Sequence, residues 1–380
     1  MVRRRKTQLE DMTSKTSEAN PLLALLLVLR LYGHVPVTTH QSGNVSFSAC
    51  SGAMVYCMAA TAVQLTMVGY SVRWFILQEE FWANFDNTMS SVSCFVILLS
   101  ALHPVFFTWA DTPLIARFVN QWNHLQVALL YVTREPVTSV ILDYPVSGCI
   151  LISMTSAVIL CLLPSVLSGH VDTIVVITFM LVIGYLNMVS WFWVVSTQYV
   201  SIAANHLKDS VLMAMENIAS TQKLRSHRAL WLELHSFSTA LSEGMGDTMR
   251  AWETIMVFSF VLSLYNWAIC IHSNQPILQS SSAFMTAVHS GLHTLLLHNT
   301  THVADYKVGR GFALGILSCR FQKFSDEQLN EVELLLLAIE TSSNRFLLKG
   351  MIDFKRPLLV TIMESTITIL VVLIQFKVFV

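Results

Sequence analysis

Near its C-terminus the chain carries a row of polar side chains inside an apolar run, at the spacing of one helix face. The row consists of Thr361, Glu364, Thr368, Val371 (or Val372) and Gln375. An acidic residue near the centre of a membrane helix costs about 2.5–3.5 kcal/mol on insertion scales, so such a face usually borders a bundle interior or water. In the alternative, the threonines bond to their own helix, Gln375 lies at the outer interface, and Glu364 pairs with Lys355 or Arg356.

Histidines at positions 289, 293, 298 and 302 form i, i+4 pairs, a spacing that metal sites also use. No HExxH motif accompanies them, so we expect polar contacts within a helix bundle and predict neither a metal nor a cofactor. The seven cysteines form no CxxC pair, and no Walker loop or nucleophile elbow occurs. An enzyme is therefore not expected.

The elements that position these residues follow from composition. Hydrophobic residues make up 54% of the 380 positions and charged residues only 12%, whereas soluble domains carry about 25% charged residues. Five long stretches lack Asp, Glu, Lys and Arg: 47–71, 87–110, 144–171, 173–207 and 254–304. A membrane-spanning helix needs about 20 apolar residues, and each stretch is long enough. The chain is predicted to be an all-α membrane protein embedded in a lipid bilayer.

Polar breaks and prolines divide the apolar stretches into seven predicted transmembrane helices. These are 46–71, 88–110, 145–168, 173–200, 251–272, 277–299 and 356–377. The predicted organisation is an N-terminal segment 1–45 with an interfacial helix, spans one to four in 46–200, helical extensions in 201–250, spans five and six in 251–299, an anchor region in 300–355, and the last span in 356–380. The interfacial helix is predicted for 21–36, which is too short to span.

Orientation follows from the lysines and arginines, which favour the cytoplasmic side. Of the 23 in the chain, 21 lie in segments on one side of the predicted bundle, and only Arg73 and Lys377 lie on the other. The N-terminus is therefore predicted to be cytoplasmic and the C-terminus extracellular. The sequons at Asn44 and Asn299 then lie on the inner side or at its boundary, where they would not be glycosylated.

The long inner segments carry apolar residues at helical spacing, which predicts helices that continue the fourth and fifth spans into the cytoplasm. Ser325 followed by Gln328 is a capping-box pattern and predicts a helix from Asp326 to Leu348. Two interpretations remain open for this region: a small cytoplasmic helical domain, or a platform for assembly between subunits.

The end of the last span resembles the C-terminal signature of insect gustatory receptors, which is Thr-Tyr, five hydrophobic residues and Gln-Phe. Thr368, Gln375 and Phe376 match it, as does the apolar run between them, and Ile369 stands in place of the tyrosine. The stretch from Gly350 to Asp353 is also similar to the family's sequence before its last helix. The layout of seven inverted spans agrees with this family along nearly the whole chain.

The resemblance implies a ligand-gated, non-selective cation channel in the plasma membrane, made of four subunits around a central pore. The family's last helix lines the pore, so Gln375 and Phe376 become gate residues, and Glu364, Thr368, Val371 and Val372 become pore-facing candidates. A ring of hydrophobic side chains can gate by dewetting, and a ring of carboxylates favours cations. Implied partners are a small-molecule tastant, permeant cations, and identical or related receptor subunits, with no nucleic acid.

Family members bind tastants in an outward-facing pocket within each subunit. Candidate residues in the outer halves of the spans are Gln64, Tyr70, Trp74, Ser90, Ser93, Tyr185, Tyr265, Asn266, Trp267 and Met285. Aromatic groups with a few polar ones suit a small-molecule site, and the run from Tyr265 to Trp267 is the first choice. The alternative is that these rings lie at membrane interfaces, where Trp and Tyr are enriched anyway. A largely aromatic pocket favours a bitter or amphipathic compound over a sugar.

A secondary transporter is the main alternative function, because polar groups within a bundle also form substrate paths. The predicted spans show no duplicated pattern of the kind that transporters commonly carry. A G-protein-coupled receptor conflicts with the charge asymmetry. Ligand-evoked current would distinguish a channel from strictly coupled uptake.

Overall fold

The protein is described by a computed structural model, which covers residues 21–40, 43–77, 92, 94–133, 146–168, 172–272, 277–342, 346–348 and 352–379. Helices make up most of it. In chain order the elements are α2 (Pro21–Leu31), β1 (Val37–Thr39), β2 (Val45–Phe47), α3 (Gly52–Leu77), η2 (Ser100–Leu102), η3 (Pro104–Thr108), α5 (Trp109–Thr133), α6 (Val146–Ser168), α7 (Thr173–Glu216), α8 (Thr221–Gly244), α9 (Gly246–His272), α10 (Ile277–Val308), α11 (Arg310–Leu317), α12 (Asp326–Thr341), β3 (Leu347–Leu348), β4 (Ile352–Asp353) and α13 (Arg356–Phe379).

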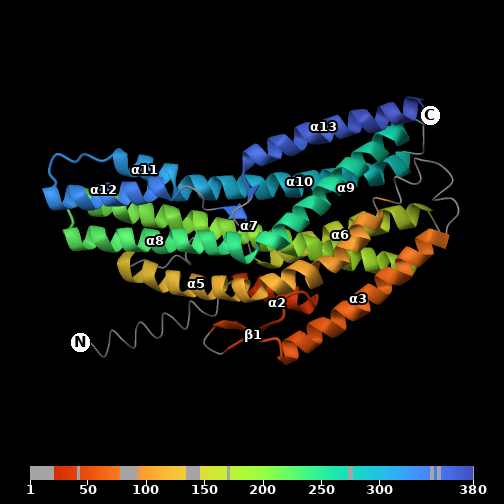
Figure 1. Cartoon of the computed structure of the whole chain (residues 1–380), viewed down its shortest axis with the longest axis horizontal. Helices are drawn as coiled ribbons and strands as arrows, with labels where there is room; N and C mark the ends of the chain where they lie inside the picture. Colours follow the sequence, from red (N-terminus) through yellow and green to blue (C-terminus); the bar gives the residue numbers. More distant parts are fainter. Residues whose placement is uncertain are drawn as a thin grey trace.

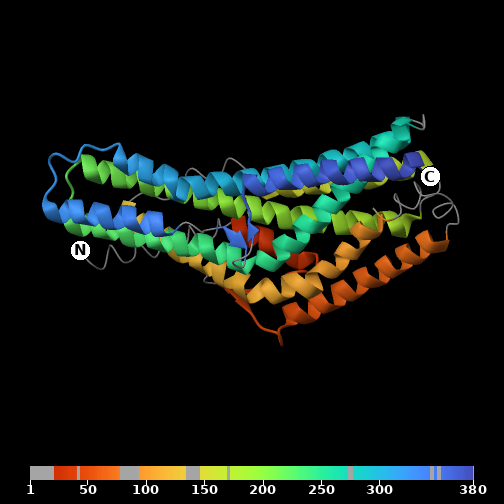
Figure 2. The same cartoon turned by 45° about the horizontal axis from the view of Figure 1, so that its top comes forward.

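The helices form one elongated bundle (Figure 1). Helices α8, α11 and α12 gather with the end of α7 at one extremity, and the C-terminal half of α13 lies at the other. The second view shows the same separation (Figure 2). The bundle therefore has two distinct halves along its length.

Helix α7 forms the axis of the molecule. Its 44 residues correspond to about 66 Å at 1.5 Å per residue, roughly twice the thickness of a bilayer core. Trp193 of α7 is completely buried and donates its indole N–H to Thr301 Oγ1 over 2.8 Å. Helix α7 thus continues without a break past residue 200, where the fourth predicted span ends, to Glu216.

Five helical stretches among the described residues are long and apolar enough to cross a membrane. They are Gly52–Leu77, Cys94–Thr133, Thr173–Glu216, Gly246–His272 and Arg356–Gln375. The residue ranges of helices α6 and α10 include nearly all of the other two predicted spans, 145–168 and 277–299. The prediction of a helical membrane protein is confirmed.

The N-terminal region contains a hairpin that the sequence did not suggest. Strands β1 and β2 pair antiparallel, with Thr38 opposite Ser46, and the helix of the first predicted span begins only at Gly52 instead of residue 46. Asn120 of α5 fixes the hairpin, because its amide accepts from the N–H of Val45 and donates to the carbonyl of Val45, each over 2.8 Å. The hairpin thus depends on a side chain 75 residues away.

The second predicted span, 88–110, is longer than expected. Its helical stretch continues to Thr133 and passes through the π-helical turn η3 at Pro104. Proline lacks an N–H and clashes with the preceding turn, so the helix widens locally. The segment up to Thr133 extends the bundle toward α8, which it contacts.

The helix predicted from Asp326 to Leu348 ends earlier, at Thr341. Its capping box is present as predicted: Gln328 N–H donates to Ser325 Oγ, and Ser325 N–H donates to Gln328 Oε1. Leu347 and Leu348 instead form strand β3, which pairs with β4 just before α13. Apolar spacing alone does not separate the end of a helix from the short strand that follows it.

Candidate functional site

Helix α13 buries one narrow stripe within the single chain. Its more covered side chains are Leu358, Ile362, Thr366, Leu370 and Leu373, and the helix contacts α9 and α10. In the most apolar window of α13 only 6% of the residues are buried, against 61% in α7. Most of the helix surface is therefore not covered by the rest of the chain.

The predicted polar row lies on the uncovered surface. Thr361, Glu364, Thr368, Val371 and Gln375 are all exposed, as is Val372. Phe376 belongs to α13, but its side chain lies outside the described part. The row is thus turned away from the core of the subunit.

Part of the alternative interpretation of this row is confirmed. Thr368 donates its hydroxyl to the carbonyl of Glu364 over 3.0 Å, and Thr361 donates to the carbonyl of Pro357 over 3.3 Å, which are the expected bonds of threonines to their own helix. The place of Gln375 at the outer interface stays a prediction. The expected partners of Glu364 are engaged elsewhere. Lys355 Nζ lies 3.2 Å from Asp305 Oδ2, and Arg356 Nε donates to Asn299 Oδ1 over 3.2 Å.

One candidate ligand residue of α9, Trp267, packs against α10. The rings of Trp267 and Phe284 lie 5.1 Å apart, and Met285 beside Phe284 is exposed. Tyr265 is fully buried, and Asn266 is partly buried. The ring pair of Trp267 and Phe284, with the exposed Met285, forms an aromatic α9–α10 surface.

The candidates on α3 and α7 are engaged within the protein. Gln64 donates to the carbonyl of Tyr32 over 2.8 Å, and Tyr70 donates to Asp172 Oδ2 over 2.6 Å. The Trp74 ring packs edge-on against Phe75 at 5.1 Å. Ser90 and Ser93 lie outside the described residues. These side chains do not share the α9–α10 surface in the contacts observed.

Tyr185 is part of a buried polar network instead of an open pocket. Its hydroxyl lies 2.7 Å from His103 Nδ1 and 2.9 Å from Thr108 Oγ1. His103 Nε2 donates to the carbonyl of Thr248 over 2.8 Å, which leaves Nδ1 of a neutral ring as the acceptor for the tyrosine. The network joins the π-turn, α7 and α9.

A cavity of about 310 Å³ lies between α5 and α8. Polar side chains contribute much of its lining, among them Arg117, Gln121, His235 and Glu243. None of the candidate ligand residues lines it. It belongs to the half of the bundle that carries α8 and α12.

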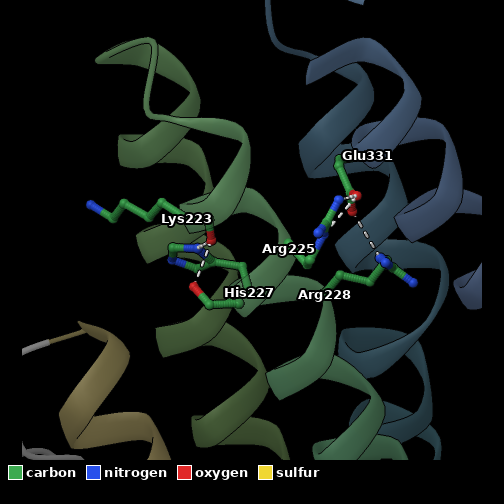
Figure 3. Close-up of polar contacts among 6 residues, drawn as sticks. Lys223, Arg225, His227, Arg228 and Glu331 are labelled. Carbon is green, nitrogen blue, oxygen red and sulfur yellow. Dashed lines mark hydrogen bonds and ion pairs between the residues drawn. The ribbon is translucent and has the colours of Figure 1, made fainter. Parts of the chain in front are cut away.

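An ion-pair cluster fixes that half of the bundle. Arg225 and Arg228 of α8 point toward Glu331 of α12, as Figure 3 shows, with N–O distances of 3.0 and 3.1 Å. The Glu331 side chain is only 5% exposed. Desolvation raises the pKa of Glu331, but the hydrogen bonds from the two arginines outweigh it and leave the pKa below its ordinary value. Burial lowers the pKa of nearby His227, whose Nδ1 donates to the carbonyl of Lys223.

Comparison with known proteins shows that the chain is similar to insect chemoreceptors. The chain is 22% identical over 363 residues to gustatory and odorant receptor 22 of Anopheles gambiae, covering 93% of this chain and 77% of that one. It is 22% identical to gustatory and odorant receptor 21a of Drosophila melanogaster over 93% of this chain and 80% of the relative. No family model matches the sequence.

The fold is similar to the olfactory receptor OR5 of Machilis hrabei, with a TM-score of 0.67. The likeness covers 93% of this chain and 97% of that structure at 10% sequence identity. The same receptor in complex with eugenol gives a TM-score of 0.63. The resemblance to the insect chemoreceptor family is confirmed.

Sequence reasoning missed several residues that organise this chemoreceptor-like fold. His103 carried a signal, because a histidine before a proline inside an apolar run indicates a local break in the helix. The contact between Asp111 and Thr248 left no signal in the sequence, because the two residues lie 137 positions apart. Three of the four α10 histidines, at positions 289, 293 and 298, make polar contacts in the bundle as expected, whereas Nδ1 of His302 has no hydrogen-bond partner among the described residues. Among the described residues no group of three metal-binding side chains comes together.

Proposed function

We propose that the chain is a subunit of a ligand-gated, non-selective cation channel of the plasma membrane, with α13 lining the pore. The observation that carries this proposal is the uncovered polar row on α13, opposite a stripe that packs on α9 and α10. A helix with an exposed carboxylate is costly next to lipid. Four copies around one axis, as the family resemblance implies, would turn this row toward water.

The proposed topology has seven spans, a cytoplasmic N-terminus and an extracellular C-terminus. Helices α8 and α11, which carry Lys223, Arg225, Arg228 and Arg310, lie with α12 at one extremity, while the end of α13 lies at the other (Figure 1). This separation agrees with the distribution of lysines and arginines that favours a cytoplasmic anchor region. The region of 300–355, in which α12 forms ion pairs with α8, would be that anchor.

Gln375 and Phe376 are the proposed gate at the outer end of α13. Glu364, Thr368, Val371 and Val372 would follow along the pore toward the cytoplasm. Rings of apolar side chains close such a path by dewetting, and a ring of Glu364 carboxylates would select for cations. No enzymatic role is proposed.

The proposed ligand is a small amphipathic tastant, with a bitter compound favoured over a sugar. The α9–α10 surface supports this choice, since Trp267 and Phe284 offer apolar area and Asn266 offers a single amide. Its outward-facing position follows from the proposed topology. The structural neighbour that holds eugenol, an aromatic molecule, is consistent with it.

The test is electrical recording from cells that express this chain alone, with a panel of amphipathic aromatic compounds. We expect ligand-evoked cation current, and altered gating in Gln375→Ala and Phe376→Ala. Asn330→Ala, an exposed substitution on α12, is the matched control and should leave the current unchanged. Strictly coupled uptake of a solute with no channel current would contradict the proposal and favour a transporter.

A further inference from the structure

The segment that leads into α13 is held by a buried carboxylate–imidazole pair. His298 of α10 is fully buried, and its Nε2 lies 3.1 Å from Oε1 of Glu253 on α9. On its other side, His298 Nδ1 lies 3.1 Å from the carbonyl oxygen of Lys355, the residue just before α13. One imidazole therefore bridges α9, α10 and the start of α13.

The Lys355 carbonyl is part of the first turn of α13, because it also accepts from the N–H of Leu358 over 3.1 Å. Phe354 is fully buried, and its ring lies 4.4 Å from that of His298. The bridge therefore ends at a carbonyl in the first turn of α13, next to the buried ring of Phe354. Displacing His298 would remove the hydrogen-bonded link between α9 and the start of α13, while the packing of α13 on α9 would remain.

The hydrogen bonds of this bridge fix the number of protons it needs. A carbonyl only accepts, so Nδ1 of His298 must donate to Lys355. The contact with Glu253 then needs a second proton, either on Nε2 facing a carboxylate or on the carboxyl group donating to Nε2. With one proton fewer, a bare nitrogen faces either the carboxylate or the carbonyl, and one arm of the bridge is lost.

The other charged groups of this junction have separate partners. Lys355 Nζ pairs with Asp305 Oδ2 at 3.2 Å and with Asp353 Oδ1 at 3.0 Å, and Arg356 donates to Asn299. Among the described residues, Arg250, three positions before Glu253 on α9, pairs with Asp247, and His302, one turn further along α10, is partly buried. Glu253 Oε2 is buried and accepts no hydrogen bond from the residues that the structure describes. An ionised, solvent-free carboxylate would be costly there without the second proton.

We propose that Glu253 and His298 are positioning residues that hold the start of α13 through a shared proton, so that loss of this proton loosens the junction. The consequence for gating rests on the proposed channel function, in which this junction lies at the cytoplasmic end of the pore helix. Loss of the shared proton would then weaken the link between α9, which carries candidate ligand residues, and α13.

Hydrogen–deuterium exchange of the purified full-length chain tests this without any ligand or current. The readout is the protection of peptides covering 352–362, corrected for intrinsic exchange, at about pH 6 and about pH 8. In the wild type we expect protection to fall about fivefold at the higher pH. A change of this size corresponds to the loss of one net hydrogen bond. Equal protection at both pH values would overturn the proposal.

Glu253→Gln is the decisive variant. Its amide can donate to Nε2 of a neutral His298 whose Nδ1–H still bonds Lys355, so both arms persist without a shared proton. Protection should stay high at both pH values. A pH-dependent loss as large as in the wild type would refute the shared proton.

Two controls exclude other origins of the effect. Asn299→Ala removes the contact to Arg356, so we expect less protection at both pH values with the pH dependence retained. His302→Gln should keep the wild-type pattern, and loss of the pH dependence in this variant would overturn the assignment to His298. A chain that shows the expected exchange but passes no current would contradict the channel proposal and leave the junction as described.

Discussion

Thr248 donates both its backbone N–H and its hydroxyl to Oδ2 of Asp111, each over 2.9 Å. Helix α9 begins at Gly246, so the N–H of Thr248 is one of those that no turn of the helix can satisfy. The carboxylate comes from α5 and is fully buried. Asp111 therefore acts as a distant cap that ties α5 to the start of α9.

Replacing this cap should destabilise the fold. We expect Asp111→Ala to lower the free energy of unfolding by about 1–3 kcal/mol, because it leaves a buried N–H and hydroxyl without their acceptor. Thermal melting in detergent, followed by tryptophan fluorescence, measures the effect. Asp209→Ala, which removes an exposed carboxylate from α7, should change little. Equal melting of the two variants would show that the cap contributes nothing.

Gly244 lets α8 approach α5 closely at the same junction. A Cβ at this position would lie 3.3 Å from the backbone carbonyl carbon of Leu114, tighter than ordinary contact and against atoms that cannot rotate away. Gly244→Ala should therefore destabilise by about 1–3 kcal/mol, as overpacking does. Gly69→Ala is the matched control, because a Cβ added there would meet nothing within 4 Å, and we expect it to be neutral or stabilising. Chemical denaturation that ranks the two variants in the opposite order would contradict this account.

The Glu331 cluster should make the anchor half of the bundle sensitive to acid. The pKa of Glu331 is lowered in the folded chain, so its stabilisation is complete at neutral pH and is lost as the pH falls through that lowered value. Melting at about pH 7 and about pH 4 should show a larger acid loss for the wild type than for Glu331→Gln. Arg228→Ala should cost more than Arg225→Ala, because Arg228 is 28% exposed and Arg225 58%. Identical acid profiles of wild type and Glu331→Gln would argue against the cluster.

The proposed pore predicts a charge effect at Glu364. Glu364→Gln should reduce the preference for cations over anions, because a ring of carboxylates attracts cations into the path. Reversal potentials under a salt gradient measure this preference. Met363→Ala changes a neighbouring exposed position on another face of α13 and should leave the selectivity unchanged. An unaltered reversal potential in Glu364→Gln would remove Glu364 from the pore.

Much of this fold could be predicted from the sequence, because burial in lipid requires long apolar runs and because capping residues mark where helices begin. Asp172 caps α7 by accepting from the N–H of Ile174 over 2.7 Å, next to a break that the sequence marks. The Ser325 capping box is equally local. Both features involve residues within three positions of each other.

Features that join distant segments could not be predicted in this way. The hairpin of β1 and β2 depends on Asn120, and the junction before α13 depends on Glu253 and His298, 45 positions apart. The i, i+4 histidines drew attention to α10 but not to their acceptors on other helices. The α13 row was predicted from spacing; its residues are exposed in the single chain, and their place in a pore stays a prediction. The ligand candidates were chosen by residue type, which does not separate an open surface such as Trp267 from a buried network such as that of Tyr185.

Glycosylation tests the orientation of the whole bundle. If the N-terminus is cytoplasmic, Asn44 beside the hairpin and Asn299, which binds Arg356, should carry no glycan when the chain is expressed in eukaryotic cells. A sequon appended after Val380 should be glycosylated, because the C-terminus would face the lumen during synthesis. The measurement is the mobility shift on treatment with a glycosidase. A control chain in which the Asn of the appended sequon is changed to Gln should show no shift. A glycan on Asn44 or Asn299 would contradict the proposed topology.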